Sequence, residues 1–169
     1  SGLVTIDSTV TEVTGTLTNI QYALKNATVG TGSVGVAAAD ISIAGIENKN
    51  IAVTGAKLSK ANYLAIQNNY NTGVITAELE DMDYDTFTEK VSAGSTVKKI
   101  QSGNKLAVKI TDNTLTAAKV LEIGDSTTGA VHLKPGGNMG ITGKASELAR
   151  IYGNIVDAKT KDGFLDTNI

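Results

Sequence analysis

Short runs of β-branched and aliphatic residues alternate along this chain with stretches in which apolar residues recur at helical spacing. Residues 74–79 and 106–110 are rich in strand-forming side chains and partly alternate between apolar and polar, which predicts strands. The stretches after Thr16 and Lys144 gather their apolar side chains on one helical face, which predicts amphipathic helices. Strands that alternate with short helices favour parallel strands joined by helical crossovers.

Two of the predicted helices begin with the same local signals. Ser59 and Thr116 are suited to cap a helix N-terminus, because a hydroxyl oxygen can accept the unpaired amide protons of the first turn. Each is preceded by a leucine, and an apolar residue, Tyr63 or Val120, follows four positions after the cap. This spacing is that of a hydrophobic staple, and its occurrence at two matched places suggests an internal repeat.

Self-similar stretches support that repeat. A hydroxyl residue, a glycine and a β-type run occur together three times, at Gly2, Gly73 and Gly129. The last two glycines are 56 residues apart and the first two are 71 apart, so an insertion is expected in the first copy. Residues 51–61 also align with 108–118, and residues 13–15 with 141–143.

We therefore expect one repeat domain over residues 1–169. Its approximate copies are residues 1–71, with the insertion at 27–48, then 72–127, and a partial copy at 128–169. Each copy is expected to fold as strand, helix, strand, helix. The predicted fold class is α/β, with tandem strand-helix repeats forming a short solenoid-like parallel sheet with short helices. A compact α/β sandwich of the copies is the alternative.

Several short motifs resemble repeats of large bacterial secreted and cell-surface proteins, of the adhesin-like, S-layer-like and RTX types. The motifs are residues 13–16, 110–112, 115–118, 127–129 and 141–145, most of them next to an expected helix. The resemblance implies a secreted or cell-surface protein with a structural role. It brings no catalytic residues with it.

Composition narrows the range of functions. The net charge of −2 gives no electrostatic footprint for nucleic acid, and no apolar run is long enough to insert into a membrane. The chain has no Cys, which removes disulfides and thiol chemistry, and His132 is its only histidine. A single imidazole cannot build a histidine-based zinc site, and we interpret His132 as a strand residue. Only 4% of the residues are aromatic, so we expect the hydrophobic core to be built from many small aliphatic side chains.

A glycine-rich motif at residues 30–35 matches the spacing G-x-G-x-x-G of dinucleotide-binding loops. A dinucleotide site requires a strand before the motif, a helix after it and an acidic residue about 20 positions on. Here a helical stretch precedes the motif, and Gly55 stands where the acid is expected. We interpret the motif as a loop within the insertion.

Charged side chains offer two further features. Asp81, Asp83 and Asp85 have the spacing of the first ligands of a calcium loop, but the glycine and the glutamate that complete an EF-hand are missing. Solvated acids at a helix start are the preferred interpretation, and Ca²⁺ is the one cofactor left open. Glu147 and Arg150 are expected to form a pair on the surface of one helix.

These observations predict a non-enzymatic structural or adhesive repeat module of a large extracellular bacterial protein, which presents surfaces for adhesion or self-assembly. The expected partners are neighbouring repeats of the same protein or surface glycans, with no nucleic acid. The alternatives are a carbohydrate- or Ca²⁺-binding module and a phage or appendage fibre domain. No pair of carboxylates stands out as a catalytic pair.

Overall fold

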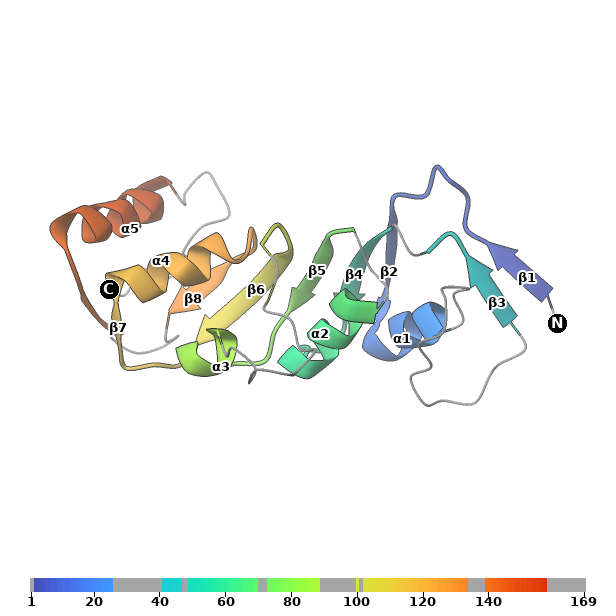
Figure 1. Cartoon of the computed structure of the whole chain (residues 1–169), viewed down its shortest axis with the longest axis horizontal. Coiled ribbons are helices and arrows are strands. Elements are labelled where there is room, and N and C mark those ends of the chain that lie inside the picture. Colours follow the sequence, from blue (N-terminus) through green and yellow to red (C-terminus); the bar gives the residue numbers. More distant parts are fainter. Residues whose placement is uncertain are drawn as a thin grey trace. The chain divides into compact units, whose positions relative to one another are not determined.

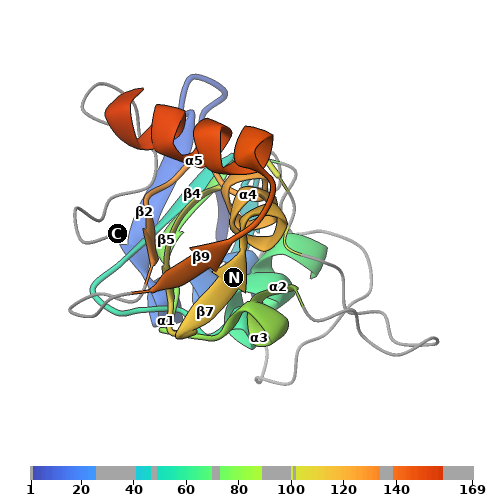
Figure 2. The same ribbon diagram turned by 90° about the vertical axis from the view of Figure 1, so that its left-hand side faces the viewer.

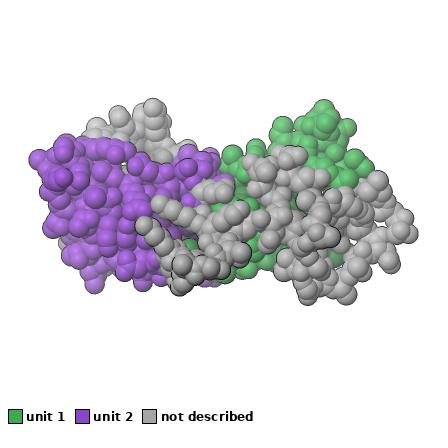
Figure 3. Space-filling model, in the orientation of Figure 1, with its two compact units in different colours: residues 1–78 green, residues 79–169 purple. Residues whose placement is uncertain are grey.

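The computed structural model describes residues 2–25, 41–46, 49–69, 73–88, 100, 102–133 and 139–157. The chain forms two compact units, Ser1–Glu78 and Leu79–Ile169, which Figure 3 shows in different colours. Each unit combines short strands with short helices. The predicted α/β class is therefore confirmed.

Unit 1 pairs all its described strands in parallel. Strand β1 lies beside β3, and β4 lies between β2 and β5 (Figure 1). Helix α1 follows β2 directly and packs against it. The elements of this unit are β1 (Gly2–Thr5), β2 (Glu12–Thr16), α1 (Leu17–Lys25), β3 (Ile41–Ala44), β4 (Asn50–Thr54), α2 (Lys60–Asn69) and β5 (Ile75–Glu78).

Unit 2 also pairs its strands in parallel, β6 with β8 and β7 with β9. Helices α4 and α5 pack against each other, and Figure 2 shows β7 and β9 side by side, with α5 following β9. The elements of this unit are α3 (Tyr84–Thr88), β6 (Lys105–Ile110), β7 (Thr114–Thr116), α4 (Ala117–Asp125), β8 (Val131–Leu133), β9 (Gly140–Thr142) and α5 (Ala145–Asp157).

The main sheet of unit 1 is parallel with the strand order β2-β4-β5, and the main sheet of unit 2 pairs β6 with β8 in parallel. Beside β6, the segment that begins at Leu79 supplies backbone hydrogen bonds: Leu79 N donates to the carbonyl of Ala107 and Met82 N to that of Lys109. Most helices follow two strands, as in β6-β7-α4, whereas the sequence pattern predicts a single strand before each helix. The second strand of a pair has only three to five residues, which is too short to show a period of its own.

Aliphatic residues stand in register across the strands and build the core. In unit 1, Val13 lies opposite Ile51, which lies opposite Ile75, and in unit 2 Val108 lies opposite Val131. All of these are buried except Val13 on β2, which is half-buried. Burial of such side chains is the main source of stability in a protein with few aromatic residues.

The predicted helix caps are confirmed. The hydroxyl of Ser59 accepts a hydrogen bond from the backbone N–H of Asn62 at 3.2 Å. At the start of α4, Thr116 has an extended backbone, and its hydroxyl accepts from the N–H of Lys119 at 3.4 Å. The leucines before both caps and the apolar residues four positions after them are buried, as the staple pattern predicts.

At two of the three aligned glycines, a side chain is excluded for the same structural reason. A Cβ atom at Gly73 would lie 2.5 Å from the carbonyl oxygen of Lys49, and one at Gly129 would overlap the carbonyl of Leu106. In both places the chain passes too close to another backbone segment for any side chain, at the start of β4 for Gly73 and at β6 for Gly129. Gly2 differs, because β1 pairs with β3 in a separate two-stranded sheet, whereas β5 and β8 each belong to the main sheet of their own unit.

The expected insertion at 27–48 is described only in part. Residues 41–46 contribute strand β3, which pairs with β1 in parallel. The glycine-rich motif at 30–35 lies outside the described residues.

Candidate functional site

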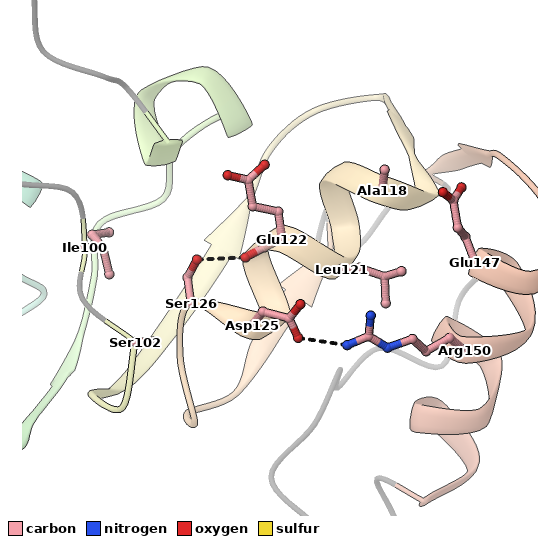
Figure 4. Close-up of a pocket in the computed structure, with 9 residues that line it drawn as sticks. All are labelled: Ile100, Ser102, Ala118, Leu121, Glu122, Asp125, Ser126, Glu147 and Arg150. Carbon is pink, nitrogen blue, oxygen red and sulfur yellow. Dashed lines mark hydrogen bonds and ion pairs between the residues drawn. The ribbon is translucent and has the colours of Figure 1, made fainter.

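A groove between helices α4 and α5 of unit 2 is the candidate binding surface. Its volume is about 600 Å³, and Figure 4 shows its lining. Acidic, basic and hydroxyl side chains line it together with a small apolar patch. The lining residues are Ile100, Ser102, Ala118, Leu121, Glu122, Asp125, Ser126, Glu147 and Arg150.

An ion pair joins the two helices at this groove. Arg150 Nη2 on α5 lies 3.0 Å from Asp125 Oδ1 on α4 (Figure 4). The predicted partner of Arg150, Glu147, instead accepts a hydrogen bond from the backbone N–H of Lys144 at the start of α5. This is half of a capping box, and it stabilises the first turn of the helix. Both members of the Arg150–Asp125 pair are more than half exposed, so the pair contributes little to stability.

Glu122 connects the groove to helix α3. The hydroxyl of Tyr84 donates a hydrogen bond to Glu122 Oε2 at 2.6 Å, and the ammonium of Lys119 lies 4.2 Å from the centre of the Tyr84 ring. Burial and the neighbouring Glu122 carboxylate raise the pKa of Tyr84 above its usual value. The backbone N–H of Tyr84 donates to Asp112 Oδ2 at 2.7 Å, so this residue ties α3 to two other parts of unit 2.

The three aspartates of the predicted calcium loop have different surroundings. Asp83 caps α3, because its Oδ1 accepts from the backbone N–H of Thr86 at 2.6 Å, and the hydrogen bonds from Thr86 lower the pKa of Asp83. Asp85 lies in the first turn of α3, with its carboxylate 3.8 Å from the ammonium of Lys119. The side chain of Asp81 is exposed. In the part of the chain that the structure describes, no three His, Cys, Asp or Glu side chains converge to hold a metal ion.

Several polar side chains that line the groove make contacts within unit 2. The three carboxylates of the groove each accept a described hydrogen bond or ion pair, and its Ser126 hydroxyl donates to the backbone carbonyl of Glu122 at 2.7 Å. The one imidazole of the chain, His132, is in β8, as predicted, and is not among the lining residues.

Sequence reasoning did not single out this groove as a site. Ala118, Leu121, Glu122 and Asp125 share one face of α4 by their spacing of three to four residues. That face gave no functional signal, because its partner surface on α5 is brought beside it only by the packing of the two helices.

The chain matches no protein-family model, and comparison with curated proteins and with solved structures yields no significant match. Among the described residues, no helix has the length and apolar character needed to cross a membrane.

Proposed function

We propose that the chain is a non-enzymatic structural repeat module of a large extracellular bacterial protein, and that its successive coils form a solenoid. The observation that carries this proposal is the equivalence of Gly73 and Gly129. Each lies against a backbone carbonyl, that of Lys49 directly before β4 for Gly73 and that of Leu106 in β6 for Gly129. A spacing of about one repeat that recurs both in sequence and in backbone packing is the signature of a stacked array.

In this role the module acts mechanically. Parallel strands in register join one coil to the next through backbone hydrogen bonds, and the helices cover the aliphatic core. The exposed outer surface, including the groove between α4 and α5, is then available for adhesion. Secretion or display at the cell surface and contact with neighbouring repeats or surface glycans are parts of the same proposal.

Small-angle X-ray scattering tests the solenoid. A compact domain of this length has a radius of gyration of about 15 Å. We expect a clearly larger value and a skewed distribution of interatomic distances. A value at the compact limit would favour the alternative α/β sandwich.

A retention assay tests the adhesive role. Beads coated with the chain are flowed over immobilised bacterial polysaccharides, with beads coated with heat-unfolded chain as the control. We expect retention that depends on the folded chain and falls when Asp125 and Arg150 of the groove are both changed to Ala. Equal retention of both bead types on every surface would contradict adhesion.

A further inference from the structure

Strand β2 of unit 1 and strand β8 of unit 2 have one neighbouring strand each among the described residues. We propose that β2 of one copy of this chain pairs in parallel with β8 of a second copy, so that the sheet of unit 2 in one copy continues into the sheet of unit 1 in the other. This inference rests on the proposed repeat function and names its partner as a second copy of the same chain.

The outward edge of β2 has no strand partner among the residues that the structure describes. Asn50 N donates to the carbonyl of Thr11 at 3.0 Å, and β2 pairs with β4 in parallel. In a parallel pair, alternate residues turn their N–H and C=O groups to the same side. Thr11 and Val13 therefore face β4, and the backbone groups of Glu12 and Thr14 face away from it.

The side chains of β2 indicate that a neighbour is missing there. Val13 is in register with Ile51 and Ile75, which are 0% and 1% exposed, yet Val13 itself is only half-buried. Val10, just before β2, is 37% exposed. The apolar column that runs through the strands of unit 1 thus ends on a side chain that another strand would cover.

The edge of β8 that faces away from β6 has no described strand partner and presents alternate backbone groups, as the edge of β2 does. Val108 N donates to the carbonyl of Ala130 at 2.8 Å, so Ala130 and His132 turn their backbone groups toward β6. By the same alternation, the backbone groups of Val131 and Leu133 face outward.

A second copy is the occupant that the existing strand pairs favour. Each described strand pair in the main sheets of unit 1 and unit 2 is parallel and places β-branched residues opposite each other. Continuing this arrangement places Val131 of one copy opposite Val13 of the other, and His132 opposite Thr14. Because the two edges differ, the contact is heterologous, and one copy can offer β2 to one neighbour and β8 to another.

Disulfide trapping tests the proposed register, and the absence of Cys makes each introduced thiol unique. Thr14→Cys and His132→Cys chains are purified separately, mixed and oxidised gently. Adjacent strands lie about 5 Å apart, within reach of a disulfide. We expect the mixture to give cross-linked dimer several-fold above a control mixture of Ser8→Cys with His132→Cys. A yield equal to the control, or cross-linking only between identical variants, would overturn the proposal.

Edge blocking tests the same contact without a cross-link. In Thr14→Pro the lost N–H faces away from β4, so the intramolecular pairing is retained. Thr14→Ala loses the same side chain and keeps the N–H. In sedimentation velocity we expect the mass of the wild-type and Ala chains to grow with concentration, and that of the Pro chain to stay monomeric at unchanged circular dichroism. Equal behaviour of the Pro and Ala chains would also overturn the inference. The scattering and bead experiments use dilute or immobilised single copies, so the solenoid and adhesive roles stand or fall separately.

Discussion

Gly129 lies directly against the backbone carbonyl of Leu106, and no side chain fits between them. The same relationship joins Gly73 to Lys49 in unit 1. Close backbone approach therefore occurs at one glycine in each unit, and its consequences for stability can be measured.

Replacing Gly129 or Gly73 by Ala should destabilise the unit that contains it. The added methyl group meets backbone atoms, which cannot move as a side-chain tip can, so we expect a loss of about 1–3 kcal/mol or more in the free energy of unfolding. Urea denaturation measures this loss. Gly15→Ala is the control, because a Cβ there would lie at an ordinary 3.5 Å from its neighbours. A control variant as unstable as the other two would contradict the steric explanation.

Thr127 satisfies several buried backbone groups at once. Its hydroxyl accepts from the N–H groups of Leu106 and Gly129, at 2.9 and 3.0 Å, and donates to the carbonyl of Leu106 at 2.8 Å. Thr127→Val keeps the shape but leaves both buried donors without this acceptor, at a cost of about 1–3 kcal/mol for each group. We expect a large fall in thermal stability for Thr127→Val and a small one for Thr127→Ser. Equal effects of the two variants would show that the hydroxyl is unimportant.

The helix caps at Ser59 and Thr116 should contribute similarly to the free energy of unfolding. Ser59→Ala and Thr116→Ala each remove the acceptor for an N–H group in the first turn of a helix. Each change should cost about 1 kcal/mol in chemical denaturation. Exchanging the residues, as Ser59→Thr and Thr116→Ser, retains the hydroxyl and should recover most of that stability. A cap whose loss has no effect would not be part of the repeated helix start.

Asp83 should make stability depend on pH in the acidic range. Hydrogen bonds from Thr86 hold its pKa below the ordinary value, so the ionised form is favoured in the folded chain. Its contribution is fully present above the unfolded pKa of about 4 and is lost as the pH falls through the lower folded pKa. Melting curves of the wild type and Asp83→Asn should therefore differ at pH 7 and converge at lower pH. A difference that persists unchanged in acid would exclude the charge as its cause.

Calcium is not expected to stabilise the chain. Asp83 is engaged as a helix cap and Asp85 lies beside Lys119, so ligation would have to break contacts that already stabilise α3. We expect the same melting temperature in saturating Ca²⁺ and in chelator. A melting temperature that rises in Ca²⁺ for the wild type and not for Asp81→Asn would instead establish the calcium loop.

Local features of this protein were predictable because they depend on neighbours in the chain. The caps at Ser59 and Thr116, the strand around Val108 and the parallel α/β class follow from hydroxyl placement, β-branched runs and the alternation of elements. The 56-residue spacing of Gly73 and Gly129 is likewise visible in sequence.

Only the tertiary structure decided which strand lies beside which and what each polar side chain contacts. The sequence aligns Gly2 with Gly73, yet β1 pairs with β3 outside the main sheet of unit 1. Arg150 has Glu147 within reach on its own helix, yet it pairs with Asp125 on α4. Strand pairing and helix packing join residues that are far apart in the chain, and a sequence pattern records only the spacing of residues along it. The partly covered Val13 on β2, and with it the proposed contact between copies, could be found only after the neighbours of each strand were known.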